Sequence, residues 1–307
     1  MFFRAPSKKK IILHIGLPKT GSTALQQALH QSREALLRQG VLYPAKVHCE
    51  DDPKHNFVLD LVRKGQGYDI SSERGYKTTS RIVISNEALS NDFYYHGMEQ
   101  NRQLADLLRV HGELEICMVL RRERDWLRSY YKQAVINQSV KGKSHYQNSL
   151  PIDAFRDMEP VRRLLDFGSL IQDISAGFQA PVRVMRYEEI QVSQVIQYCT
   201  GLPVDLGSLR GRHNESVSDA AVEIMRQLNA EIGSIEEKCA WSNLLVKASG
   251  AKHAVLGTLA ARATPEAVAA LDRAKIDSVR FLSGETLQVD RTEFDMVLLA
   301  MKENFSN

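Results

Sequence analysis

The residues best placed to do chemistry form a short loop near the amino terminus. The loop follows an apolar run that predicts a strand at 11–16, and a helical pattern begins at residue 22. It is bounded by Gly16 and Gly21 and contains one cation, Lys19. In such a strand–loop–helix arrangement, the backbone N–H groups of the loop and the positive end of the helix dipole converge on one point. The pattern therefore predicts a cradle for an anion.

The loop is similar to a Walker A motif, but its cation is displaced. Gly16 and Gly21 have the Walker separation and Thr23 occupies the hydroxyl position, whereas Ser22 stands in the place of the Walker lysine. A Walker lysine reaches the outer phosphates of a nucleoside triphosphate, and the hydroxyl after it holds Mg²⁺. Lys19 lies three residues earlier, in the middle of the loop. This displacement argues against a nucleotide-dependent kinase.

The same loop resembles the 5′-phosphosulfate loop of sulfotransferases that use 3′-phosphoadenosine 5′-phosphosulfate. In that family the loop lysine neutralises the bridging and sulfuryl oxygens, so the resemblance implies a catalytic role for Lys19 and no metal. The residues that it implies as donor-binding are Pro18, Lys19, Thr20, Gly21, Ser22 and Thr23. The alternative interpretation is an ordinary Gly-bounded turn that carries a surface lysine.

A second segment extends the resemblance, which covers mainly residues 11 to about 135. A predicted strand at 114–120 ends at Arg121, and a helical pattern follows. In sulfotransferases an Arg at this strand end and a Ser eight positions later bind the 3′-phosphate of the nucleotide, and Arg121 and Ser129 have that spacing. An Arg fork suits a phosphate bidentately. The alternatives are a solvated strand-end cation and a neutral residue on the helix surface.

Two later segments carry a weaker likeness to the family. A predicted strand at 182–186 is followed by Tyr187 and Glu188, as in the next strand of sulfotransferases. The segment 212–216 is similar to the basic loop that closes over the nucleotide, which implies Arg212 as a further cofactor-binding residue.

The acceptor proton needs a base, and the predicted strand at 81–85 indicates where it lies. Cytosolic sulfotransferases place a His after a Lys-Thr pair there, whereas this chain has Asn86 and then Glu87. Several carbohydrate sulfotransferases use a Glu, so we expect Glu87 to be the base, with a pKa raised by partial burial and by the anionic donor. Glu87 could instead begin a short helix. The rival bases, expected on surface loops, are His55, His96 and His145.

The alternation of apolar strands and helical patterns predicts an α/β protein with a three-layer, P-loop-like fold, in which helices flank a central parallel sheet. Ligands then bind beyond the carboxyl ends of the strands. The organisation expected is a single domain over 1–307, with a nucleotide-binding core at about 11–235 and a helical addition at about 236–307. Helices are expected at 22–39, 57–64, 98–110, 161–177, 191–199, 217–231 and 254–274, and an acceptor-side loop at 139–150.

Composition narrows the class of protein. The chain has 307 residues and a net charge of only +3, which does not indicate a nucleic-acid partner. Its four cysteines are widely spaced and form no metal-ligand pattern, so no metal site is expected. No signal peptide and no run of about 18 apolar residues is present, so we expect a cytoplasmic, bacterial enzyme without an integral membrane segment.

The function predicted from these features is transfer of a sulfuryl group from 3′-phosphoadenosine 5′-phosphosulfate to a hydroxyl of a small-molecule or glycan acceptor. A carbohydrate or glycolipid acceptor is favoured because a Glu replaces the His and because the loops are polar and contain Tyr94, Tyr95 and Tyr146. Two alternatives stay open: a small-molecule kinase, and a non-catalytic nucleotide-binding protein of the same fold.

Overall fold

The computed structural model describes residues 8–44, 53–65, 68–140, 143–203, 217–250, 263–276, 279–280, 286–287 and 289–305. These residues divide into two compact units. The first comprises the described parts of Met1–Arg122 and Asp166–Gly211, and the second those of Glu123–Leu165 and Arg212–Asn307. The single-domain organisation expected from the sequence stays a prediction.

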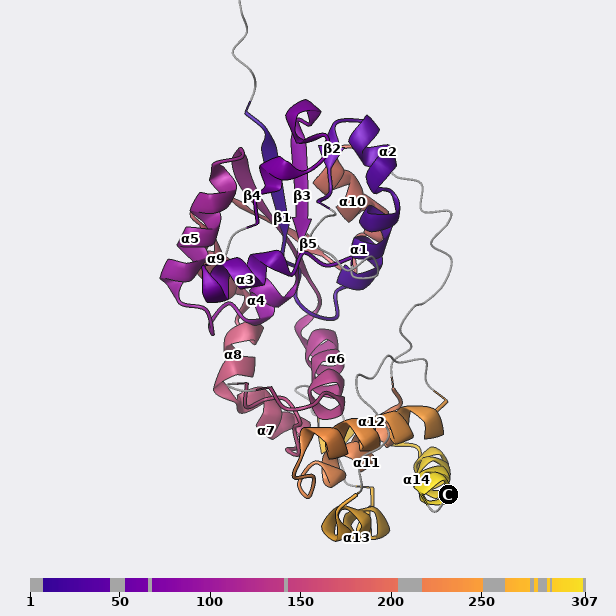
Figure 1. Ribbon diagram of the computed structural model, residues 1–307. Coiled ribbons are helices and arrows are strands. Elements are labelled where there is room, and N and C mark those ends of the chain that lie inside the picture. The colour runs from indigo at the N-terminus through magenta and orange to yellow at the C-terminus, as the bar shows by residue number, and fades with distance from the viewer. Residues whose placement is uncertain are drawn as a thin grey trace, which may run out of the picture. The chain divides into compact units, whose positions relative to one another are not determined.

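A five-stranded, wholly parallel sheet forms the centre of the first unit and confirms the predicted α/β class (Figure 1). The strand order is β2-β3-β1-β4-β5. The strands are β1 (Lys10–His14), β2 (Val41–Leu42), β3 (Arg81–Ser85), β4 (Glu113–Leu120) and β5 (Val182–Arg186). The connection after β1 leads toward one edge of the sheet, to β2, and the connection after β4 leads toward the opposite edge, to β5. The sheet therefore has a topological switch point between the carboxyl ends of β1 and β4.

Helices cover both faces of this sheet because its inner strands are apolar on both sides (Figure 1). One face packs against α1 (Ser22–Gln31), α2 (Arg33–Arg38) and α10 (Val192–Thr200). The other side carries α3 (Phe57–Lys64), α4 (Ala88–Asn91), α5 (Met98–Arg109) and α9 (Phe167–Phe178). Two short 3₁₀ turns, Ile70–Ser72 and Tyr76–Thr78, precede β3. The three predicted layers are therefore present.

The second unit is mainly helical. It contains α6 (Glu123–Ile136), α7 (Ile152–Asp157), α8 (Glu159–Leu165), α11 (Asp219–Leu228), α12 (Ile235–Ala248), α13 (Pro265–Arg273) and α14 (Arg291–Phe305). Two short strands, β6 (Val279–Arg280) and β7 (Thr286–Leu287), pair antiparallel. In its interior Trp126 stacks on Tyr130, and the fully buried Lys238 donates to the carbonyl oxygen of Val135 at 2.6 Å. Burial lowers the pKa of Lys238 well below its usual value.

Several predicted elements differ from those observed. The helix expected at 22–39 is interrupted at Ser32, and the one expected at 161–177 is divided into α8 and α9. Asp166 causes the second division, because its side chain accepts from the N–H of Ser169 and caps a new helix. By contrast, α3, β3 and β5 have the predicted bounds. Across the ranges that the structure describes, no helix is long and apolar enough to cross a membrane.

Candidate functional site

The loop between β1 and α1 has the backbone of an anion cradle. Lys19 and Gly21 both adopt left-handed conformations, with φ of 68° and 82°, on either side of Thr20. Alternating left-handed residues turn successive N–H groups inward, as in phosphate-binding nests. For a residue with a side chain this conformation costs of order 1–3 kcal/mol, so strain is stored at Lys19. Gly21 is the N-cap residue of α1 and has no side chain with which to cap the helix start.

The hydroxyls of the loop have different environments. The buried side chain of Thr20 donates to the carbonyl oxygen of Leu17 at 2.5 Å, which closes the loop on itself. The hydroxyl of Ser22 is also buried, but it has no hydrogen-bond partner within the described chain. A buried hydroxyl without a partner is costly, and an anion bound at the helix start would satisfy it. Ser22 therefore fits the predicted ligand better than Thr20, which can offer only its N–H.

Arg121 lies beside the loop, at the switch point of the sheet. Its Nη1 donates to the carbonyl oxygen of Lys19 at 3.5 Å. Its guanidinium carbon lies 5.2 Å from the ring centroid of Tyr187, which follows β5. A Cβ placed on Gly21 would be 3.3 Å from Cε2 of Tyr187, so this ring also covers the loop. The ends of β4 and β5 thus bring a cation and an aromatic ring to the cradle.

Glu87 lies at the carboxyl end of β3, directly before α4, and two donors hold its carboxylate. Gln26 of α1, which is fully buried, donates to Oε2 at 2.7 Å, and Lys54 contacts Oε1 at 2.5 Å. The neighbouring Ser90 hydroxyl donates to the carbonyl oxygen of Gly16 at 3.0 Å. These contacts place Glu87 at the same end of the sheet as the loop, while the carboxylate itself is tied to the helix that the loop begins.

We expected a raised pKa for Glu87. In this structure the expectation is wrong, because the pKa is lowered. Burial favours the neutral acid and is the largest single influence on the pKa, but Lys54 and Gln26 both stabilise the carboxylate. Together with smaller effects they lower the pKa below its ordinary value. The sequence offered no means of foreseeing this, because Lys54 is remote from Glu87 along the chain and lies outside any motif.

A buried histidine links the ends of β1 and β3 beside the loop and Glu87. His14, the last residue of β1, places its Nδ1 2.8 Å from the hydroxyl of Ser85. Gln26 also donates to that hydroxyl, at 3.2 Å. Burial lowers the pKa of His14 to about 4, although the charge of Glu87 partly opposes the shift. His14 is therefore neutral under ordinary conditions, and the ring serves the structure, as its place inside a strand predicts.

Two of the three rival histidines are buried and contact other groups of the protein. His55 is fully buried rather than on the surface, and its Nδ1 accepts from the N–H of Ser85 at 2.9 Å, while Nε2 lies 3.0 Å from the carbonyl oxygen of Pro44. Both nitrogens are therefore engaged with backbone groups. His145 is also fully buried, in the second unit, with Nε2 2.8 Å from the Tyr130 hydroxyl. His96 is partly buried, between α4 and α5.

The remaining predicted site residues are placed as follows. Pro18 is buried in the loop and Thr23 is partly exposed in the first turn of α1. Ser129 is partly buried in α6 and belongs to the second unit, so its role beside Arg121 stays a prediction. Arg212 lies outside the described residues.

Sequence analysis missed three residues of this site. Gln26 follows Ser22 by one helical turn, a spacing that indicates a shared face. Tyr187 was visible only as part of a strand-end Tyr-Glu pair. Lys54 carried no signal at all.

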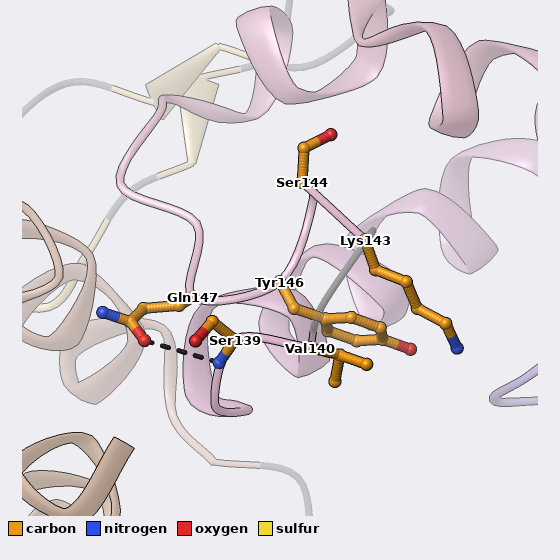
Figure 2. Close-up of a pocket in the computed structure, with 6 residues that line it drawn as sticks. All are labelled: Ser139, Val140, Lys143, Ser144, Tyr146 and Gln147. Atoms are coloured by element: carbon orange, nitrogen blue, oxygen red, sulfur yellow. Dashed lines mark hydrogen bonds between the residues drawn. The ribbon is translucent and has the colours of Figure 1, made fainter. Parts of the chain in front are cut away.

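The predicted acceptor-side loop at 139–150 borders an open hollow in the second unit (Figure 2). The ring of Tyr146 and the ammonium of Lys143 lie 5.8 Å apart there, and Gln147 accepts from the N–H of Ser139 at 3.4 Å (Figure 2). None of the described residues that line the hollow carries a carboxylate or an imidazole. Its link with the loop of the first unit stays a prediction.

No protein-family model and no curated protein matches the chain. The assignment of a function therefore rests on the residues of the site. Within the ranges that the structure describes, no group of three or more His, Cys, Asp or Glu side chains could hold a metal ion.

Proposed function

We propose that the protein is a sulfotransferase that takes its sulfuryl group from 3′-phosphoadenosine 5′-phosphosulfate. The observation that carries the proposal is the loop, which combines two left-handed residues, a helix start at Gly21, a buried Ser22 hydroxyl and one cation, Lys19. Arg121 adds a guanidinium at the adjacent strand end. This set of donors suits a ligand with anionic groups at two positions.

In the proposed reaction, the oxygen of an acceptor hydroxyl forms a bond to sulfur. The bond from sulfur to the bridging 5′-phosphate oxygen breaks, and that oxygen leaves with the electron pair on adenosine 3′,5′-bisphosphate. Lys19 and the loop N–H groups stabilise the charge that grows on the leaving phosphate. Glu87 is a carboxylate at neutral pH and takes the acceptor proton, although its lowered pKa makes it a weaker base while Lys54 pairs with it.

The acceptor class that we propose is a carbohydrate or glycolipid hydroxyl. The support is the carboxylate of Glu87 at the end of β3. The neighbouring Asn86 has a structural contact instead, because its side chain donates to the carbonyl oxygen of His55 at 3.1 Å. We also propose a cytoplasmic location, which suits the free cysteines Cys117, Cys199 and Cys239 of the described chain.

The alternative of a kinase is less well supported by the same loop. A kinase needs a lysine at the helix start and a carboxylate for Mg²⁺. Ser22 occupies the lysine position, and the carboxylate of Glu87 is already held by Lys54 and Gln26. The non-catalytic alternative predicts nucleotide binding without turnover.

Calorimetry with two nucleotides tests the proposal. We expect adenosine 3′,5′-bisphosphate to bind in the presence of a metal chelator, and ATP to bind more weakly whether or not Mg²⁺ is added. Binding of ATP only with Mg²⁺, and none of the bisphosphate, would establish the kinase instead. An acceptor screen with radiolabelled sulfuryl donor then separates the enzyme from a non-catalytic binder.

A further inference from the structure

The Glu87 carboxylate is held from two sides that differ in accessibility. On the inner side Gln26 is fully buried, and its amide is fixed by Glu87 and by the hydroxyl of Ser85. On the outer side Lys54 keeps 37% of its side-chain surface exposed, against 15% for Glu87. Gln26 is therefore a fixed partner, whereas the side chain of Lys54 is partly exposed to solvent.

The backbone that carries Lys54 is anchored firmly to the sheet. The N–H of His55 donates to the carbonyl oxygen of Ser85 at 3.1 Å, and the His55 ring accepts from the N–H of Ser85 at 2.9 Å. The hydroxyl of Tyr43 donates to the carbonyl oxygen of Pro53 at 2.7 Å. Residues 53–56 are thus fastened to the end of β3, and the Lys54 side chain extends from a rigid base to Glu87.

The ion pair with Lys54 lowers the affinity of Glu87 for a proton and so weakens it as a base. While Lys54 remains on the carboxylate, Glu87 holds its charge too well to draw a proton from a hydroxyl. A neutral hydroxyl cannot compete with a carboxylate for an ammonium group, but a second anion can. When an anion takes Lys54, burial becomes the dominant influence on Glu87, and its affinity for a proton rises.

We infer that Lys54 is an acceptor-binding residue, and that the acceptor carries an anionic group close to the hydroxyl that receives the sulfuryl group. This inference rests on the proposed function and adds the substrate class. A uronic acid, or a sugar that is already sulfated, has the required chemistry. Lys54 selects the acceptor by its charge and, by leaving Glu87, prepares the base.

Binding of two matched saccharides tests this inference. The probes are a tetrasaccharide of alternating uronic acid and N-acetylhexosamine, and the same tetrasaccharide with its carboxyl groups reduced to alcohols. Each is titrated by calorimetry into the protein saturated with adenosine 3′,5′-bisphosphate. We expect the acidic form to bind roughly tenfold or more tightly than the reduced form, as one engaged charge pair allows.

Three variants assign the preference to Lys54. Lys54→Gln should remove the difference between the two saccharides, and Lys54→Arg, which keeps the charge, should retain most of it. Lys64→Gln is the matched control, because Lys64 pairs with Asp60 at 2.9 Å on the exposed side of α3. It should leave the preference unchanged. The affinity for the bisphosphate should be the same in all three variants.

The outcomes separate this inference from the proposed function. If adenosine 3′,5′-bisphosphate does not bind, the proposed function itself fails. If it binds but the acidic saccharide binds no better than the reduced one, or binds not at all at millimolar concentration, the inference is overturned and the proposed function stands. A preference that persists in Lys54→Gln also overturns it.

Discussion

The guanidinium of Arg121 donates to the carbonyl oxygen of Lys19, although the two residues are 102 positions apart in the chain. The contact joins the residue after β4 to the loop after β1, across the switch point of the parallel sheet. It has two consequences. It supports the left-handed backbone of Lys19, and it places a bidentate anion-binding group beside the cradle.

The first prediction concerns the charge of Lys19. Because position 19 is left-handed, Lys19→Asn is the most informative change, since Asn tolerates that conformation better than other residues with side chains. Turnover, measured as release of adenosine 3′,5′-bisphosphate, should fall roughly a hundredfold or more, because charge grows on the leaving phosphate. Lys19→Arg should retain much more activity. Near-normal turnover in Lys19→Asn would exclude the catalytic role.

The second prediction concerns the 3′-phosphate. Arg121→Ala should weaken binding of adenosine 3′,5′-bisphosphate by roughly tenfold or more, and binding of AMP much less, because only the former offers a second phosphate to the guanidinium. Calorimetry on both ligands measures the difference. Arg122→Ala is the control, since this neighbouring side chain is exposed. Equal losses for the two ligands in Arg121→Ala would mean that Arg121 supports only the backbone of the loop.

The third prediction concerns Gly21, whose φ of 82° favours glycine. Gly21→Ala should lower the free energy of unfolding by about 1–2 kcal/mol through backbone strain. It should also weaken bisphosphate binding, because the added Cβ meets the Tyr187 ring. Gly40→Ala is a matched control, with φ of 79° and only an ordinary contact 3.7 Å away at Ser80. It should show the same loss of stability by thermal unfolding and unchanged binding; a matching loss of binding would contradict the assignment.

The fourth prediction concerns the base. Glu87→Gln preserves the shape of the side chain and removes the proton acceptor, so turnover should fall by about two to four powers of ten with bisphosphate affinity nearly intact. Measurement of turnover and of affinity on the same preparation separates the two effects. A variant that loses thermal stability and nucleotide binding together would show that Glu87 only holds the end of β3.

The sequence predicts the fold better than the surroundings of the site. A parallel sheet is predicted by strands that are apolar on both faces, such as β3. A ligand at its carboxyl edge is predicted by the glycines that bound the loop, Gly16 and Gly21. The partners of Glu87 could not be predicted in this way. Lys54 reaches it through a segment fastened by the buried ring of His55, a tertiary contact that leaves no periodic trace in the chain. The same contact turns a histidine expected on the surface into an interior anchor.

The fifth prediction is a dependence of stability on pH that comes from His14. Its pKa is about 4 in the folded protein and 6.5 in an unfolded chain. Between these values the unfolded chain binds a proton that the folded one does not, so stability must fall as pH decreases from 6.5 to about 4. Because the ring is fully buried, the loss attributable to His14 is of order 3 kcal/mol over this range.

The test compares the wild type with His14→Asn by urea unfolding at several pH values. The variant should be less stable at pH 7, because a buried ring is lost, but its stability should decline less between pH 6.5 and 4.5. Glu87 does not obscure this interval. Its pKa is lowered in the folded state, so the stability that it contributes is present above its unfolded pKa of 4.5 and is lost only below that value. Parallel curves for the two proteins above pH 4.5 would contradict the prediction, because they would show that His14 binds its proton equally well in the folded and unfolded states.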